Sequence, residues 1–206
     1  MYRYADKAIK DMNRRNIRAF DRLKQLKFDE LNILQSVTET YDTSVKLAKK
    51  RYQQIAFEAY IAALVRVLVS KAEAEGMAED SITEDWVLDM LEEYDPVTLY
   101  QFLPEAERKK QRTIEAIIAS HDKAEAIDRA LRLWVLQTTH YADKSVDEAT
   151  IDAYKDAGIQ KVKWVTAEDD KVCKVCRKRN GKIYPVGKIP PKPHYHCRCE
   201  LWPVLD

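Results

Sequence analysis

The chain has 206 residues, of which 46% are hydrophobic, and its formal net charge is +1. This length can bury one moderate core, and no apolar run approaches the roughly eighteen residues of a membrane-spanning helix. Residues 1–27 carry nine Lys or Arg against three acids, residues 72–107 carry twelve acids and no Lys or Arg, and residues 159–199 carry eleven Lys or Arg against three acids. We therefore expect basic surfaces near both ends of the chain and an acidic one in the middle.

The first 75 residues contain neither proline nor glycine, the two strongest helix breakers. We predict helix over almost all of this segment. From Leu31 onward, apolar side chains recur every three or four residues, as on one face of an amphipathic helix; they are Leu34, Tyr41, Val45, Ala48, Tyr52, Ile55 and Ala59. The pattern fits the core of a helical bundle or a stalk that packs against a partner's helices. Between Ile61 and Val69, apolar residues occur on more than one face, so we predict that this stretch is the most buried part of the helix.

Shorter helices are predicted between residues 81 and 158, because polar caps and prolines mark several starts. These signals are Ser81 with Glu84, Asp95 with Pro96, Pro104, Asp122 with Glu125, and Ser145 with Glu148. His140 is predicted to lie in a loop and, alone, indicates no site. Gly158 is the residue at which the last of these helices should end.

After Gly158 the pattern changes to short β segments, first residues 160–165 and then Ile183 with Tyr184. We place the domain boundary there. The predicted fold class is mainly α: residues 1–158 form a body with long N-terminal helices, and residues 159–206 form a small zinc-stabilised β appendix.

All four cysteines and two of the four histidines lie between Trp164 and Trp202. They are Cys173, Cys176, His194, His196, Cys197 and Cys199. Each end of this set can sit on a tight turn, and the loop between them brings the two turns together, as in structural zinc sites. Asn180-Gly181 is a strong turn signal. Because the loop has few apolar residues to bury, we expect metal binding to supply folding free energy.

The exact ligand set stays open at this stage. Cys173 and Cys176 belong to every workable set of four. The second pair is His194 with Cys197, or Cys197 with Cys199, whose side chains share one face if the chain is extended there. We expect Cys173, Cys176, His194 and Cys197 to bind a structural Zn²⁺, with Cys199 and His196 as alternates. Four protein ligands leave no open position for catalysis.

Other readings of the cysteines have less support. Residues 1–7 show no charged segment followed by an apolar signal core, so we expect synthesis in a reducing cytoplasm rather than a disulfide-bonded secreted module. No strand and helix of a thioredoxin-like unit precedes Cys173, which disfavours a redox Cys-x-x-Cys motif. A zinc-anchored His-Asn-His nuclease would need a catalytic helix after Cys199, and only residues 200–206 follow.

Several of these motifs together resemble a known family. Trp164-Val165-Thr166-Ala167-x-Asp169 precedes the first cysteine pair, and Asn180-Gly181-Lys182-Ile183-Tyr184, a proline-rich loop and His194-x-x-Cys197-Arg198-Cys199 follow it. This order is similar to the C-terminal signature of the phage minor head proteins of the Mu F-like, or phage head morphogenesis, family. The segment Tyr154 to Ile159 resembles the lead-in to that signature. The chain departs from the family pattern at Tyr195 and His196, where proline and asparagine are more common.

The resemblance implies a low-copy structural protein of a virion. Such a protein would be made in the bacterial host cytoplasm and would dock on portal or capsid proteins, on the portal or in the capsid interior. It would assist head morphogenesis and DNA packaging or ejection. It would have no membrane association and no small-molecule substrate.

Basic side chains surround the predicted metal site. Those that could contact nucleic acid or a partner are Lys174, Arg177, Lys178, Arg179, Lys182 and Arg198. Such a cluster can neutralise phosphates, or it can be a solvated rim. Only Tyr184 and Tyr195 are available for base stacking, so we expect any DNA contact to be to the backbone and independent of sequence.

No arrangement of residues indicates an enzyme. The chain has four glycines, no glycine-rich phosphate loop and no supported Ser-His-Asp motif. We therefore expect no catalytic function. The alternative to a head protein is a stand-alone zinc-ribbon protein that binds nucleic acid.

Overall fold

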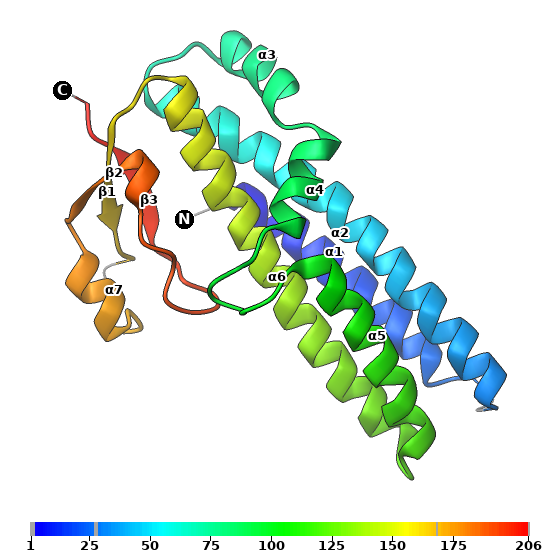
Figure 1. Cartoon of the computed structure of the whole chain (residues 1–206). Helices are drawn as coiled ribbons and strands as arrows, with labels where there is room; N and C mark the ends of the chain where they lie inside the picture. The colour runs from blue at the N-terminus through cyan, green and yellow to red at the C-terminus, as the bar shows by residue number, and fades with distance from the viewer. Residues whose placement is uncertain (1–2, 27–28, 168, 206) are drawn as a thin grey trace.

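The computed structural model describes residues 3–26, 29–167 and 169–205 (Figure 1). The helices are α1 Arg3–Leu23, α2 Glu30–Arg66, α3 Lys71–Ser81, α4 Glu84–Glu92, α5 Phe102–Ala119, α6 Lys123–Asp156 and α7 Lys174–Arg179, and the strands are β1 Lys161–Val165, β2 Ile183–Pro185 and β3 Glu200–Pro203. The predicted fold class, a helical body with a small C-terminal β appendix, is confirmed. Among the described residues, none of the helices has the length and apolar character needed to span a bilayer.

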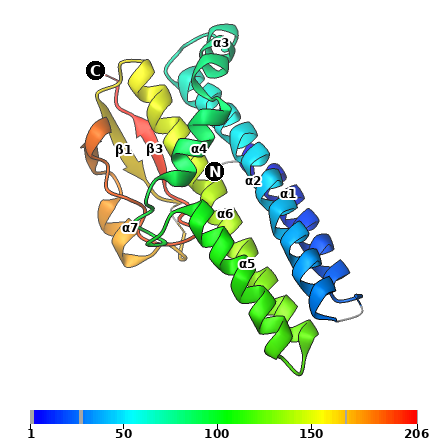
Figure 2. The same cartoon turned by 45° about the vertical axis from the view of Figure 1, so that its right-hand side comes forward.

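The body is a bundle of four long helices, α1, α2, α5 and α6, which run side by side (Figures 1 and 2). α3 and α4 pack across one end of α2. The long helix predicted from the sequence is therefore part of a bundle within its own chain. Its N-terminus is capped by Asp29, whose side chain accepts a hydrogen bond from the backbone N–H of Asn32.

Aromatic rings fill the centre of the bundle. Tyr41 of α2 contacts Trp134 of α6 with ring centroids 5.0 Å apart, and Phe102 of α5 lies 5.8 Å from the same indole. A buried polar chain runs through this core. The Trp134 Nε1–H donates to Ser44 Oγ at 2.6 Å, and Ser44 Oγ donates to Asn16 Oδ1 at 2.5 Å. This chain joins α1, α2 and α6, because each buried polar group must find a partner.

Two details of the predicted apolar stripe on α2 are wrong. Leu31 and Leu34 are exposed, and Ile33 and Val37 take the inward positions instead. Counting back from buried Tyr41 in steps of four residues leads to Val37 and Ile33 rather than to Leu34. The apolar run at residues 61–69 is not the most buried part, since α2 ends at Arg66 and Leu68, with φ of 69°, is 88% exposed.

Predicted helix starts in the acidic middle are partly wrong. Ser81 is the last residue of α3, and Thr83 caps α4 by accepting a hydrogen bond from the Trp86 N–H at 3.2 Å. Ile82, which lies between the two helices with φ of −99° and ψ of 70°, is buried. Asp95 starts no helix. Its carboxylate accepts from the N–H of Thr98 at 3.0 Å and closes the turn that precedes α5.

The segment from Asp122 to Gly158 forms one helix, α6, instead of two. Asp122 caps it as predicted, accepting from the Glu125 N–H at 2.9 Å, and Gly158 follows its end with φ of 72°. His140 is therefore helical rather than in a loop, and the Ser145 hydroxyl donates to the Ala142 carbonyl within the helix instead of capping a new one. Both side chains are buried against the body, so tertiary packing holds the helix together where the local signals predict a break.

The appendix is an antiparallel sheet in the order β2-β1-β3, packed on the side of α6 that faces away from α2 (Figure 2). Val162 and Trp164 of β1 and Leu201 of β3 are buried. The Tyr154 hydroxyl of α6 donates to the Leu201 carbonyl at 3.2 Å. Apolar burial therefore anchors the sheet, although the sequence indicated few apolar residues here. The segment from residue 169 to 199, which contains α7 and β2, buries few apolar side chains besides its cysteines.

We expect Ser44→Ala to destabilise the bundle by about 1–3 kcal/mol, because Trp134 Nε1 loses its acceptor inside the core. Urea denaturation of the full chain measures this change. Thr43→Ala, on the exposed side of the same helix, is the control and should change the free energy of unfolding by less than about 0.5 kcal/mol. Equal effects of the two variants would contradict the role of the buried polar chain.

Candidate metal centre

The first cysteine pair is positioned by the short helix α7. Cys173 is the N-cap of this helix, and its Sγ accepts a hydrogen bond from the backbone N–H of Cys176 at 3.3 Å. That hydrogen bond favours the thiolate and is the main reason why the pKa of Cys173 falls to about 7. Cys176 lies in the first turn of α7 and is buried. Burial raises its pKa to about 12.

A tight turn after α7 fixes the loop to the sheet. The backbone N–H of Lys182 donates to the Arg179 carbonyl at 3.0 Å, and Gly181 between them has φ of 76°. Asn180 with φ −53° and ψ 130° completes a turn that needs a glycine at its third position. The Gly181 N–H then donates to the Trp164 carbonyl at 2.8 Å. The predicted turn at Asn180-Gly181 is confirmed, and it ties the first cysteine pair to β1.

The second half of the cluster comes from residues 194–199, just before β3. The structure brings five of the six predicted candidates together in two overlapping groups, in each of which the ligand atoms lie within 4.8 Å of one another. The first group is Cys173, Cys176 and His194; the second is Cys176, Cys197 and Cys199. They line a hollow of about 30 Å³. Residues far apart in sequence thus converge on Cys176.

The spacing of these atoms fits a tetrahedral metal ion. Cys176 Sγ is 3.5 Å from Cys197 Sγ and 3.9 Å from His194 Nε2. In a tetrahedral zinc site, sulfur at about 2.3 Å and nitrogen at about 2.0–2.1 Å from the ion lie roughly 3.5–3.8 Å from one another. Cysteine and histidine together are the donor set that suits such an ion. The cluster can therefore hold a metal.

His194 has the orientation of a ligand. Its Nδ1 lies 2.7 Å from the carbonyl oxygen of Tyr195. Because a carbonyl can only accept, Nδ1 carries the proton and donates. Nε2, which faces Cys176, is then left with a free lone pair in the neutral imidazole. A hydrogen bond from the far nitrogen is the usual means of fixing a metal-binding histidine.

His196 lies outside both groups. Its backbone has φ of 54°, and its side chain is 52% exposed. Nδ1 is 3.9 Å from a carboxylate oxygen of Asp143. His196 also borders the hollow of the cluster, but its ring lies near α6 through Asp143.

The loop that carries the second half of the cluster is held on α6 by a partly buried ion pair. Lys192 Nζ lies 2.8 Å from Asp147 Oδ2 and donates to the Cys197 carbonyl at 3.2 Å. Burial opposes the charge on Lys192, but Asp147 outweighs this and raises the pKa of the lysine. One side chain thus joins the α6 carboxylate to the backbone of a cluster cysteine.

A second contact with α6 was not expected from the sequence. The ring of Tyr195 packs on His140 with centroids 4.7 Å apart, and His140 Nε2 lies 2.8 Å from Asp95 Oδ2. Burial alone raises the pKa of Asp95, but hydrogen bonds from His140 and Thr98 lower it to about 2. Asp95 and His140 are 45 residues apart, so no local motif could reveal the pair.

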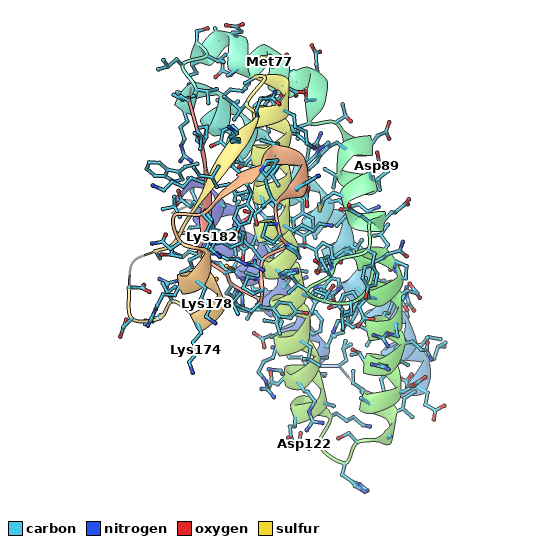
Figure 3. All side chains as sticks on the ribbon, turned by 60° about the vertical axis from the view of Figure 1, so that its left-hand side comes forward. Met77, Asp89, Asp122, Lys174, Lys178 and Lys182 are labelled. Atoms are coloured by element: carbon cyan, nitrogen blue, oxygen red, sulfur yellow. The ribbon has the colours of Figure 1, made fainter. Side chains whose placement is uncertain are left out.

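The predicted contact residues around the cluster fall into two groups. Arg198 forms a double hydrogen bond with the carboxylate of Asp169, and the guanidinium of Arg179 lies 5.0 Å from the Trp164 ring centroid. These two side chains have structural partners. Lys174, Arg177, Lys178 and Lys182 are exposed, and the Arg177 guanidinium donates to the Val172 carbonyl at 3.3 Å. Three of them, Lys174, Lys178 and Lys182, are labelled in Figure 3, where they lie on the appendix.

Comparison with known proteins supports the resemblance seen in the sequence. Residues 105–202 match the family model described as Phage Mu protein F like protein. The match begins in α5, well upstream of the motifs that indicated the family, and it includes the whole metal cluster. No curated protein and no solved structure matches the chain. From α5 to β3, the chain is therefore similar to the family described as Phage Mu protein F like protein.

Proposed function

We propose that the chain is a minor head protein of a phage, a structural component that assists head morphogenesis and the packaging or ejection of DNA. The family match over residues 105–202 is the observation that carries this proposal. The partners would be the portal or capsid proteins of the virion. The long helices offer extended faces to such partners, and the appendix adds a separate surface fixed to α6.

We propose that the cluster binds a structural Zn²⁺ through Cys173, Cys176, His194 and Cys197. Cys173, Cys176 and His194 form the first group, Cys197 Sγ lies 3.5 Å from Cys176 Sγ, and the tautomer of His194 leaves Nε2 free to bind. Cys199 is the alternate, because it lies in the second group with Cys176 and Cys197. His196 is the weakest candidate. Four protein ligands close the coordination sphere, so the proposed role is structural and not catalytic.

The metal would act on assembly by ordering the segment from residue 169 to 199. This segment is held by the turn at Gly181, the Lys192 ion pair and the cluster itself. The free energy of zinc binding would then contribute to the folding free energy of this segment. The surface formed by α7 and the following loop would then be presented in one arrangement to the virion partner.

The purified chain should contain one zinc per molecule, measured by elemental analysis. Cys176→Ser should lose the metal, because this cysteine belongs to both groups of candidate ligands. His196→Ala should retain it and serves as the control. Within the proposed set, His194→Ala should bind zinc at least about tenfold more weakly, whereas Cys199→Ser should bind nearly as well as the wild type.

If Cys199→Ser strongly weakens zinc binding and His194→Ala does not, the fourth ligand is Cys199 and not His194. Retention of the metal in Cys176→Ser would contradict the site itself. The variants should be compared at one pH, because thiolate ligands make zinc affinity depend on pH.

Co-expression with the portal and major capsid proteins of the same genome tests the proposed role. We expect the chain in purified heads, detected by mass spectrometry, and we expect Cys176→Ser to be depleted relative to His196→Ala. Wild-type chain absent from heads, while binding duplex DNA alone, would instead support a stand-alone zinc-ribbon protein.

A further inference from the structure

One face of α1 is a row of cations. Exposed basic side chains recur about once per helical turn along it; they are Lys7, Lys10, Arg14, Arg18 and Arg22. At about 1.5 Å per residue, the row is roughly 22 Å long. We call these five residues the α1 basic row. It lies outside the region that matches the family model.

The acids on the same helix do not neutralise the α1 basic row. Asp11 is bound by Arg15, at 3.0 Å, and by Arg51 of α2 at 2.5 Å. Asp21 is bound by Lys24 at 3.0 Å. Asp6 is exposed at the start of the helix. Among the residues that the structure describes, none of the five cations of the row forms an ion pair with a carboxylate. Their charge is available to a ligand.

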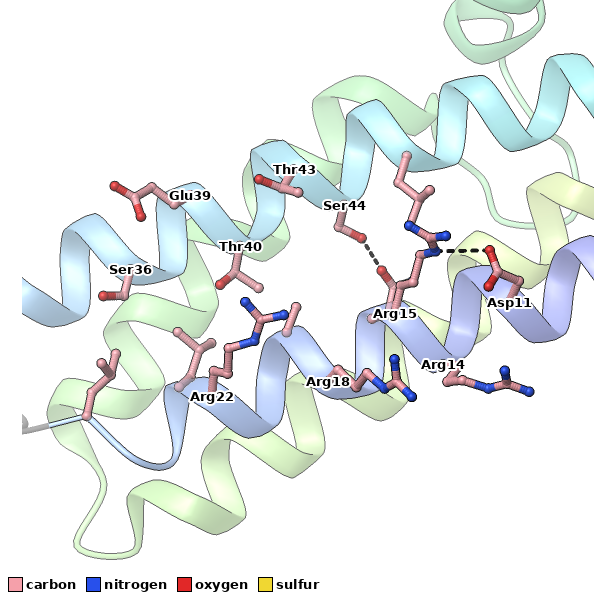
Figure 4. A pocket seen from close by; sticks show the side chains of 15 residues that line it. Asp11, Arg14, Arg15, Arg18, Arg22, Ser36, Glu39, Thr40, Thr43 and Ser44 are labelled. Atoms are coloured by element: carbon pink, nitrogen blue, oxygen red, sulfur yellow. Dashed lines mark hydrogen bonds and ion pairs between the residues drawn. The ribbon is translucent and has the colours of Figure 1, made fainter.

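The row borders a groove between α1 and α2. Two hollows, of about 670 and 730 Å³, follow one another along these helices and share Asp11, Arg14 and Arg15. Figure 4 shows the first, with Arg22 reaching toward α2. The α2 wall carries hydroxyl donors, which are Ser36, Thr40 and Thr43, and two carboxylates, Glu39 and Glu58. Glu39 and Glu58 each accept a hydrogen bond from a glutamine on α2.

The lining of the groove distinguishes between kinds of anionic partner. No aromatic residue lines either hollow. Protein interfaces are enriched in aromatic residues and depleted of charge at their centre, whereas interfaces with nucleic acid are polar and strongly positive. Arginine, lysine, serine and threonine are the usual contacts to phosphate. Single strands are bound by stacking bases on aromatic rings, so the lining favours a duplex.

We propose that the groove between α1 and α2 binds the phosphate backbone of a nucleic acid duplex through the α1 basic row, without reading its sequence. The site is separate from the metal centre and does not require zinc. It therefore goes beyond the proposed head function, and it can be tested when the metal site is intact or absent.

The test is the binding of the full-length chain to a short labelled duplex DNA, followed by fluorescence anisotropy between about 50 and 200 mM salt. The variant Arg14→Gln/Arg18→Gln/Arg22→Gln removes three cations of the row. It should weaken binding at least about tenfold near 0.1 M salt and reduce the slope of log K against log salt by about 2.7, since each phosphate contact contributes about 0.9. Arg14→Lys/Arg18→Lys/Arg22→Lys keeps the charges and should keep most of that slope.

A matched variant removes three exposed arginines from α5 and α6, namely Arg112→Gln/Arg129→Gln/Arg132→Gln. It has the same change in net charge and should bind as the wild type does. Circular dichroism spectra of all variants serve as the control for folding and should match the spectrum of the wild type. A separate variant, Lys174→Gln/Arg177→Gln/Lys178→Gln, tests the exposed cations of α7.

The site on α1 is overturned if the wild type does not bind the duplex, if the α5 and α6 variant loses as much affinity as the α1 variant, or if only the α7 variant loses affinity. Preference for single-stranded DNA, or binding of polyglutamate in place of the duplex, also contradicts it. Binding of polyglutamate in place of the duplex would indicate that the α1 basic row binds an acidic protein partner.

Discussion

The C-terminal part of this chain depends on holding sulfur atoms close together. Cys176 and Cys197 have their Sγ atoms 3.5 Å apart in a buried position. Burial raises the pKa of Cys176, and the hydrogen bond with Cys199 together with burial raises that of Cys197. These two thiols resist ionisation, and a divalent cation would reverse this because its charge stabilises thiolates. A bound metal ion would therefore stabilise this arrangement.

Helix α6 connects this centre to the rest of the molecule. Its inner face supplies Trp134 to the core of the bundle, and its outer face receives the sheet through Tyr154. Asp147 holds the loop of the second ligand pair through Lys192, and His140 supports Tyr195, the residue next to His194. The cluster is thus attached at several points to the longest helix of the family region.

The sequence predicted the features that depend on local chemistry. The absence of helix breakers predicted the N-terminal helices, Asp122 predicted the start of α6, and Asn180-Gly181 predicted the turn behind the metal centre. The cysteine spacing predicted which residues would come together, because two tight turns joined by a loop have few alternatives.

Features that depend on tertiary contact could not be read in this way. The local signal at Ser145 indicated a helix start, but burial of that residue keeps α6 continuous. The Asp95 and His140 pair joins distant segments. The basic composition of residues 1–27 was visible in the sequence, but the groove beside α1 needs α2 as its second wall. The division into two domains after residue 158 stays a prediction.

X-ray absorption at the zinc edge of the purified full-length chain tests the central claim most directly. The account predicts one zinc site with three sulfur atoms at about 2.3 Å and one nitrogen at about 2.0–2.1 Å. A chain without zinc whose residues 169–199 nonetheless give sharp, dispersed amide signals in nuclear magnetic resonance spectra would contradict it.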